Sequence, residues 1–396
     1  MSLPLDGIKV VEMGQLIAGP FAAKILAEFG AEVIKIEPPL TGDPLRKWRL
    51  LHNDTSVWWA AQSRNKQSVT LDLRQAQAQE MVRRLVKDAD VLIENFRPGT
   101  LEGWGLGWET LHELNPRLIM LRVSGYGQTG PYRDRPGFGV IGEAMGGLRH
   151  LSGEPGRTPV RVGVSIGDSL AALHGVIGVL LALRHREHNH GNGQQVDVAL
   201  YESVFNMMES LMPEYSVFQR IRQPAGSSLP GIAPTNAYRC NDGKFALIAG
   251  NGDSIYRRLM EKIERPDLAA DPALEHNDGR VQHVARIDAA ISAWTAERSL
   301  DDVLLALNEA RIPAGKIYDA ADIASDPHYL ARDMLLQSTL DDGTPVTLPG
   351  IVPKLHATPG QVRSKAPRLG QHTDAVLEAH GVDADTRADW RSRGII

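Results

Sequence analysis

The chain has 396 residues, enough to bury a large core and to form two domains rather than one. Its 43 Lys and Arg residues face 48 Asp and Glu residues, and the net charge of −5 gives no reason to expect a nucleic acid or an anionic membrane as a partner. The single cysteine, Cys240, excludes an intrachain disulfide and a zinc site built from several cysteines, and it fits a reducing, cytoplasmic location.

Two further features argue against export and against a metal. The start, MSLPLDGIKV, lacks the basic region and apolar core of a secretion signal, and the longest apolar run, around residues 176–183, is too short to cross a bilayer. His185, His188 and His190 lie at the polar end of a predicted helix without carboxylates to complete a metal site. We therefore expect a soluble protein with no membrane partner and no metal.

Strand and helix patterns alternate along the first part of the chain. Residues 7–13 predict a strand, 21–29 a helix and 31–37 a second strand, which together form a βαβ unit. The alternation continues with strands at 68–73, 90–94 and 117–123 and helices at 80–89 and 108–114. This order predicts an α/β fold with a doubly wound, mostly parallel sheet.

Residues 160–183, VRVGVSIGDSLAALHGVIGVLLAL, change pattern at one carboxylate. Val160, Val162 and Val164 alternate as in a strand, whereas the leucines after residue 168 recur at helical spacing, so Asp168 is expected at a strand-to-helix turn. The residues alone favour an N-cap worth about 1 kcal/mol, and they leave open a nucleophile that the helix N-terminus keeps ionised. Residues 163–167 formally match G-x-S-x-G, but a helix that begins after Asp168 does not give Ser165 the strand–helix elbow of a serine hydrolase.

The remaining chain divides into a second domain and a return segment. The first domain is predicted over residues 1–212, and the Pro- and Gly-rich residues 224–231 mark a change of pattern. A smaller α+β domain is expected over 213–325, with a strand at 243–249 and helices at 255–263, 287–296 and 300–310. Residues 326–396 are expected to be extended and loop-rich, with a helix at 373–378, and to complete the large domain.

Two segments that follow predicted strands are candidates for ligand binding. Residues 13–20 lack the glycine spacing of a dinucleotide site and the Lys-Ser/Thr of a P-loop, which disfavours NAD and ATP as ligands. Two interpretations stay open for this segment: it binds a phosphate at the helix N-terminus, or it is a simple tight turn. Asn95, Phe96 and Arg97 suit a stacked adenine with its phosphates, and a tight turn at Pro98-Gly99 explains them equally well. Arg64, Lys66 and Arg74 either meet further phosphates or form a solvated edge.

Sequence pieces along the whole chain resemble one family. They are PLDGIKVVEM, AGPFAAKILAEFGAEVIKIEPP, DVLIENFRPG, LNPRLI, SGYGQTGP, PVRVGVSIGD and LGQHT, in this order. The chain thereby resembles the class III CoA-transferases, the formyl-CoA transferase and CaiB/BaiF family.

The resemblance implies an activity and its site. It implies transfer of CoA from an acyl-CoA to a small carboxylic acid, with Asp168 as the nucleophile that forms a mixed anhydride, without ATP and without a permanently bound cofactor. It also implies a homodimer of two interlaced, ring-like chains, with the active site between the large and small domains. The residues that it implies for CoA contact are Gln15, Leu16, Ile17, Ala18, Leu71, Arg74, Asn95, Phe96, Arg97, Arg135, Gly137 and Phe138.

The chain departs from the family pattern at several positions. Pro38 and Gly103 stand where relatives carry CoA-contacting arginines, and Phe138-Gly139 stands where many have Tyr and an acid. Glu143 is a candidate substitute for this acid, but an ordinary position on a helix surface is the favoured interpretation. The glycine-rich lid of the formyl-CoA enzymes is missing, which disfavours formyl-CoA and oxalate.

The resemblance also includes a branch that uses succinyl-CoA with dicarboxylate-like acceptors. Residues 136–139 and 251–253 look like that branch. Two alternatives remain: an α-methylacyl-CoA racemase of the same fold, although the histidine of racemases has no counterpart in residues 135–140, and a CoA-binding protein without catalysis.

Overall fold

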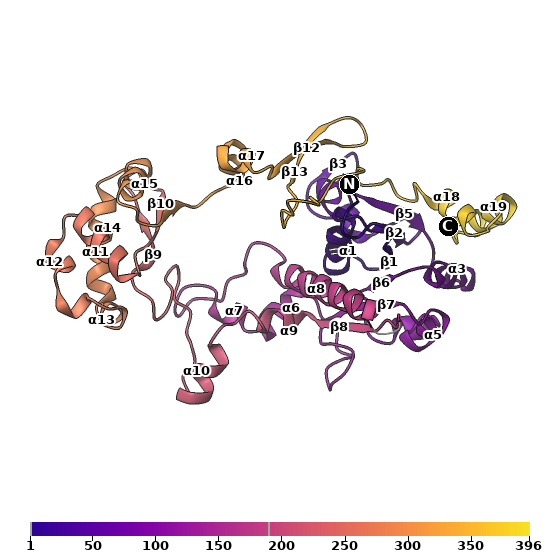
Figure 1. The fold of residues 1–396 in the computed structure, drawn as a ribbon, viewed down its shortest axis with the longest axis horizontal. Helices are drawn as coiled ribbons and strands as arrows, with labels where there is room; N and C mark the ends of the chain where they lie inside the picture. Colours follow the sequence, from indigo (N-terminus) through magenta and orange to yellow (C-terminus); the bar gives the residue numbers. More distant parts are fainter. Residues whose placement is uncertain (1, 189–190) are drawn as a thin grey trace. The chain divides into compact units, whose positions relative to one another are not determined.

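The structure is a computed structural model that describes residues 2–188 and 191–396 (Figure 1). The chain forms two compact units: the first contains the segments up to Arg149, Val162–Gln219 and Leu330–Ile396, and the second contains His150–Arg161 and Arg220–Tyr329. The structure differs from the predicted division in placing residues 150–161 in the second unit, where the Gly226 N–H donates to the Gly153 carbonyl at 3.0 Å. His190 lies outside the described residues.

A six-stranded sheet forms the centre of the first unit. Its strand order is β5-β2-β1-β6-β7-β8, and each neighbouring pair is parallel. This confirms the predicted α/β fold with a parallel sheet. The strands are β1 (Lys9–Glu12), β2 (Glu32–Glu37), β5 (Lys66–Thr70), β6 (Val91–Glu94), β7 (Ile119–Ser124) and β8 (Gln195–Ala199), of which β8 was not predicted.

Helices cover both faces of this sheet, and the strands carry apolar side chains on both faces. In β6, Val91 and Ile93 pack toward α1 (Ala18–Glu28) and α8 (Ile166–His188), whereas Leu92 packs into the core formed with α3 (Ala76–Lys87) and α5 (Trp108–Leu114). Helix α18 (Thr373–Ala379) joins this second core through Val376 and Leu377, α19 (Ala384–Ser392) packs Trp390 against it, and the final Ile395 and Ile396 follow α19 into it. The fold is therefore doubly wound.

Helix α8 corrects two expectations. The alternating valines before it form no strand: residues 160–164 are exposed and bend at residues 163–164, and β8 occupies the edge of the sheet beside β7. The apolar run of residues 176–183 belongs to a 23-residue helix, and among the described residues it alone has the length and composition to cross a membrane. Such a composition is also that of a core helix, and α8 packs against α1, β7 and β8.

The segment after residue 330 was expected to be extended. It contains a hairpin of β12 (Leu335–Thr339) and β13 (Pro345–Pro349). It then returns to the main sheet, where the Thr70 N–H donates to Thr373 Oγ1 at 2.9 Å and the Asp72 N–H donates to the Ile395 carbonyl at 2.8 Å.

The smaller elements of the first unit are η1 (Pro44–Lys47), β3 (Leu51–His52), β4 (Thr55–Ser56), α2 (Val57–Gln62), α4 (Thr100–Gly103), α6 (Gly139–Met145), α9 (Leu200–Phe205) and α10 (Leu211–Phe218).

The second unit is a small α+β body with its own core. Its antiparallel sheet has the order β11-β10-β9, and the helices pack on it around Tyr238, Ile248, Leu259 and Ile291. Helices α7 (Leu148–Leu151) and α17 (Pro327–Ala331) contain two of the four boundaries between the units. The other elements are β9 (Thr235–Arg239), β10 (Phe245–Ala249), α11 (Asp253–Lys262), α12 (Pro266–Ala269), η2 (Pro272–Leu274), α13 (Asn277–Gln282), α14 (Val284–Ala296), α15 (Leu300–Glu309), β11 (Ala314–Lys316) and α16 (Ala320–Ser325).

Candidate active site

The carboxyl ends of β1, β5, β6 and β7 meet at one edge of the parallel sheet, where ligands of such folds bind. The chain leaves β1 through a turn at residues 13–17 whose Leu16 has a φ of +64°, a left-handed conformation that costs a non-glycine residue about 1–2 kcal/mol. This turn must therefore be held by its surroundings.

Asn95, which follows β6, holds the turn on one side. Its side-chain oxygen accepts the Gln15 N–H at 2.7 Å, and its side-chain nitrogen donates to the Gln15 carbonyl at 2.8 Å. Asp43 holds the next residue, since its carboxylate accepts the Leu16 N–H at 3.0 Å. Because the N–H groups of Gln15 and Leu16 are already bonded, and one of them to a carboxylate, this turn does not offer these two amides to a phosphate. The first amides of α1, which begins at Ala18, are a separate set, so a phosphate at this helix N-terminus stays a prediction.

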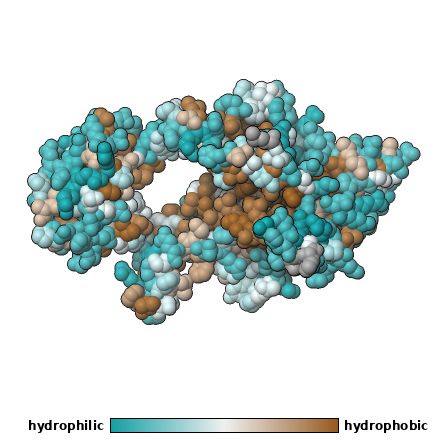
Figure 2. Space-filling model, in the orientation of Figure 1, coloured by the Kyte–Doolittle hydropathy of each residue, from teal (hydrophilic) through white to brown (hydrophobic). Residues whose placement is uncertain are grey.

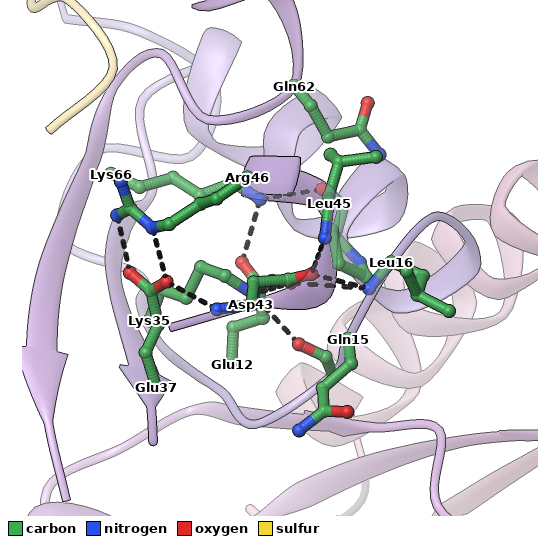
Figure 3. A network of polar contacts seen from close by, with 12 residues as sticks. Glu12, Gln15, Leu16, Lys35, Glu37, Asp43, Leu45, Arg46, Gln62 and Lys66 are labelled. Atoms are coloured by element: carbon green, nitrogen blue, oxygen red, sulfur yellow. Dashed lines mark hydrogen bonds and ion pairs between the residues drawn. The ribbon is translucent and has the colours of Figure 1, made fainter. Parts of the chain in front are cut away.

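A buried network of charges lies behind this turn (Figure 3). Lys35 Nζ lies 2.8 Å from Glu12 Oε1 and 2.8 Å from Asp43 Oδ2, and Lys66 Nζ lies 2.8 Å from Glu12 Oε2. The Arg46 guanidinium donates two hydrogen bonds of 2.8 Å to Glu37. The three carboxylates and three cations are all buried, so their charges balance inside the protein.

Burial and partners shift the pKa values of the two lysines in opposite directions. Burial lowers the pKa of Lys66 to about 8. Burial also opposes the charged form of Lys35, but the Glu12 and Asp43 carboxylates outweigh it and raise the pKa of Lys35 above its ordinary value. Lys35 is thus the cation that holds Asp43 in its ionised form. Lys66 and Arg64, expected near phosphates or at a solvated edge, are instead buried ion-pair partners of Glu12 and Glu28.

A cavity of about 520 Å³ opens beside the turn and is within the size range of small-molecule sites. The Phe96 ring lies edge-on to the Trp104 ring at a centroid distance of 5.3 Å, and Arg74 forms a bidentate pair with Asp72, with distances of 2.8 and 3.1 Å. The cavity therefore combines aromatic rings with a cation. It is lined by Met13, Gln15, Ile36, Glu37, Pro38, Pro39, Leu40, Thr41, Leu71, Asp72, Leu73, Arg74, Phe96, Trp104 and Gly394.

Asp168 lies in the first turn of α8, since the helix begins at Ile166. It is therefore inside the helix and does not occupy the N-cap position that the sequence predicted. A carboxylate in the first turn interacts favourably with the positive end of the helix dipole. Asp168 is half-buried, so its position combines this stabilisation with access.

Helix α6, which follows the loop after β7, packs against the start of α8. A Cβ atom added to Gly139 would lie 2.8 Å from Asp168 Cγ and closer still to one carboxylate oxygen, so the carboxylate occupies the space that a side chain at this position needs. Gly137 brings the loop back to β7, because a Cβ there would lie 2.9 Å from Gly125 Cα. Residues 137–139 are thus fixed at the end of β7, beside Asp168.

Glu143 lies one turn beyond Gly139 on α6 and is 1% exposed, so the expected surface position was wrong. A Cβ added to Gly167 would lie 3.3 Å from Glu143 Cγ and 3.0 Å from the Gly139 carbonyl oxygen, which shows that Glu143 faces the first turn of α8. The sequence hides this burial, because the buried residues of α6 are Gly139, Gly142 and Glu143, whereas its apolar Ile141 and Met145 are exposed.

The structure distributes the predicted CoA contacts over several environments. Gln15, Leu71, Arg74 and Phe96 line the cavity. Leu16 and Asn95 form the turn beside it, whereas the Ile17 and Ala18 side chains are buried. Arg97 is exposed after β6, Arg135 is exposed and stacks on the Tyr132 ring at 3.6 Å, and Phe138 is exposed next to Gly139.

Sequence reasoning missed three contributors to the site. Trp104 packs on Phe96, Gly394 brings the C-terminus to the cavity, and Asp43 holds Leu16. Trp104 directly follows the short helix α4, and this position could have indicated it. No local pattern connects Gly394 or Asp43 to the site. Across residues 2–188 and 191–396, no group of three His, Cys, Asp or Glu side chains is placed to hold a metal ion.

Known proteins match this chain over nearly its whole length. It is 47% identical over 395 residues to the succinyl-CoA–D-citramalate CoA-transferase of Chloroflexus aurantiacus, covering 99% of this chain and 98% of that protein. It is 34% identical over 383 residues to the succinate–glutarate CoA-transferase of Agrobacterium fabrum, covering 94% and 95%.

A solved structure matches as well. The CaiB/BaiF family protein from Brucella suis superposes with a TM-score of 0.84 at 33% identity, covering 96% of this chain and 100% of that one. The sequence model of the family described as CoA-transferase family III matches residues 5–373. With this match and these relatives, the chain belongs to CoA-transferase family III.

Proposed function

We propose that this CoA-transferase moves CoA from succinyl-CoA to a small dicarboxylate-like acid, and that Asp168 accepts the acyl group. The observation that carries the proposal is the half-buried Asp168 carboxylate in the first turn of α8, against Gly139 at the edge of the sheet. The names of the relatives, which include succinyl-CoA as donor with D-citramalate or L-malate, support the choice of substrates.

Each step exchanges one leaving group at a carbonyl carbon. An Asp168 oxygen attacks the succinyl-CoA thioester, the C–S bond breaks, and CoA leaves as the thiolate, which gives a succinyl-aspartyl anhydride. The thiolate then attacks the aspartyl carbonyl and releases succinate. The acceptor carboxylate attacks this aspartyl thioester and frees the thiolate again, and the thiolate takes the acceptor acyl group and restores the Asp168 carboxylate. No ATP is consumed, because thioester and anhydride bonds are only exchanged.

The 520 Å³ cavity suits the nucleotide part of CoA. Phe96 and Trp104 present aromatic surface to an adenine, and Arg74 offers a guanidinium to a phosphate, although it must then share its charge with Asp72. The side chains of Gln15 and Leu71 complete the wall near the turn. In this proposal the amides of Gln15 and Leu16 do not bind CoA, since they are occupied.

The test is an acceptor screen. The purified enzyme is incubated with succinyl-CoA and a panel of small mono- and dicarboxylic acids, and new thioesters are identified by mass, with Asp168→Asn as the control. We expect new thioesters with dicarboxylate-like acids and none with the variant. Transfer to none of the acids, with CoA binding retained, would favour a non-catalytic CoA-binding protein. Deuterium from solvent at the α-carbon of a branched acyl-CoA, without any acceptor, would favour a racemase.

We also propose that two copies of the chain form a homodimer. Figure 2 shows apolar side chains gathered over α8, where Leu173, Ile177, Leu180 and Leu181 are between 43% and 66% exposed. Exposed apolar residues gathered in one place are typical of an interface. Light scattering on the purified protein should give twice the chain mass. Ile177→Glu should lower this measured mass, whereas Leu305→Glu, on the exposed face of α15, should leave it unchanged. A wild-type monomer would contradict this proposal.

A further inference from the structure

Side chains from several elements bind the backbone of the turn that follows β1. The Gly14 carbonyl accepts a hydrogen bond of 2.8 Å from Lys35 Nζ in β2, and the Ile17 carbonyl accepts one of 3.2 Å from Gln62 in α2. Asn95 bonds both polar groups of Gln15, and Asp43 accepts the Leu16 N–H. The conformation of this turn is therefore imposed by tertiary contacts, which its sequence alone does not supply.

Asp43 is the member of this set that connects the turn to the charged network. Its Oδ1 accepts the Leu45 N–H at 2.8 Å and the Leu16 N–H at 3.0 Å, while Oδ2 lies 2.8 Å from Lys35 Nζ. Figure 3 shows Asp43 between Lys35 and Leu16, with the Gln15 side chain directed away from the network. Asp43 does not line the cavity, but it bonds the residue next to Gln15, which does.

The Lys35 ammonium group is fully hydrogen-bonded in the position where it holds Asp43. Its three N–H donors meet three acceptors, namely Glu12 Oε1, Asp43 Oδ2 and the Gly14 carbonyl, each at 2.8 Å. Glu12 and Lys35 are direct neighbours in the parallel pair of β1 and β2, so the register of the sheet fixes the position of the ammonium group. A buried cation with all donors satisfied holds the Asp43 carboxylate in one place.

We propose that Asp43, fixed by Lys35, is a positioning residue for acyl-CoA binding: it holds Leu16 in its left-handed conformation and so sets the Gln15 wall of the cavity. The proposal rests on the assignment of this cavity to CoA under the proposed function. It predicts that the contacts of Asp43 determine affinity for CoA and leave the chemistry at Asp168 unchanged.

The test compares Asp43→Asn with Glu28→Gln. Glu28 is a matched control, because it is also a buried carboxylate of the first unit, its Oε1 accepts a hydrogen bond of 2.7 Å from Arg64, and it does not contact the turn. Both variants should lose thermal stability. We expect Asp43→Asn to raise the KM for acyl-CoA and the Kd of free CoA by about tenfold, with kcat and the acceptor KM unchanged, whereas Glu28→Gln should leave all four constants unchanged.

A double-mutant cycle tests the role of the left-handed conformation. Glycine adopts a φ of +64° without steric cost, so Asp43→Asn should weaken CoA binding much less when it is combined with Leu16→Gly than when it is made alone. If Asp43→Asn does not fold, Asp43→Glu keeps the charge beside Lys35 but misplaces the acceptor for the Leu16 N–H, and it should show the same KM effect.

The results separate this inference from the proposed function. Equal CoA affinity in Asp43→Asn and the wild type, or equal effects of Asp43→Asn and Glu28→Gln, would overturn the positioning role. A wild-type protein that does not bind CoA in calorimetry would overturn the proposed function instead.

Discussion

Replacing Gly139 with alanine is a direct perturbation of the Asp168 carboxylate. The added Cβ would lie 2.8 Å from Asp168 Cγ, well inside an ordinary contact of about 3.5–4 Å between carbon atoms, so the carboxylate must move by on the order of 1 Å. A displacement of this size at a reacting group costs about 100-fold in rate. We therefore expect kcat for transfer from succinyl-CoA to fall about 100-fold, while the Kd of CoA, measured by calorimetry, stays unchanged.

Gly142 provides a matched control on the same helix. A Cβ at Gly142 would lie 2.8 Å from Leu200 Cβ, so Gly142→Ala crowds α9 and leaves the space around Asp168 unchanged. It should destabilise the protein by about 1–3 kcal/mol without lowering kcat of the folded enzyme. If Gly139→Ala keeps kcat within about threefold of the wild type, or if Gly142→Ala lowers it as strongly, the argument from the packing of Asp168 is refuted.

Three further predictions concern the cavity, acid stability and the second unit. Phe96→Ala removes the ring that packs on Trp104 and should raise the KM for acyl-CoA about tenfold without changing the acceptor KM; an unchanged KM for acyl-CoA would count against CoA in this cavity. Burial lowers the pKa of His372 below 6.5, and its Nδ1 accepts the Ser68 N–H. Below about pH 6.5 the unfolded chain therefore binds more protons than the folded chain, and the folded state loses stability as the pH falls. His372→Gln should thus lose less Tm than the wild type between pH 8 and pH 5, and an equal loss would contradict this. Arg280→Leu leaves the Asn251, Ala233, Leu274 and Glu275 carbonyls without their buried donor and should lower the free energy of unfolding by about 3 kcal/mol or more in a denaturant titration, whereas a loss below about 1 kcal/mol would refute this.

Much of the first unit could be predicted from the sequence, because its strands and helices differ in periodicity. The helix predicted at 108–114 is observed as Trp108–Leu114, and the strand predicted at 31–37 is observed as Glu32–Glu37. The strand predicted at 160–164 is absent because alternation makes a strand only where a neighbouring strand is available. β8, which takes the edge of the sheet, was missed although its residues, QVDVA, alternate between polar and apolar.

The site was predictable where a side chain follows a strand and not where it is held from a distance. Phe96 was expected near a ligand because it follows β6, and Leu71 because the family resemblance implied it; both line the cavity. The roles of Asp43 and Glu143 depend on tertiary packing, which no local spacing records. Lys35 and Glu12 are an intermediate case, because the strand register pairs them, but only a known pairing of β1 with β2 reveals it.

The most direct measurement of the central claim is chemical trapping at Asp168. Hydroxylamine attacks an aspartyl anhydride or thioester at the aspartyl carbonyl and leaves a hydroxamate on the protein, which peptide mass spectrometry locates. During turnover with succinyl-CoA and an acceptor acid, the account predicts a hydroxamate at Asp168 that forms only when succinyl-CoA is present. Normal turnover in hydroxylamine with Asp168 unmodified, or a hydroxamate on another carboxylate such as Glu143, would contradict it.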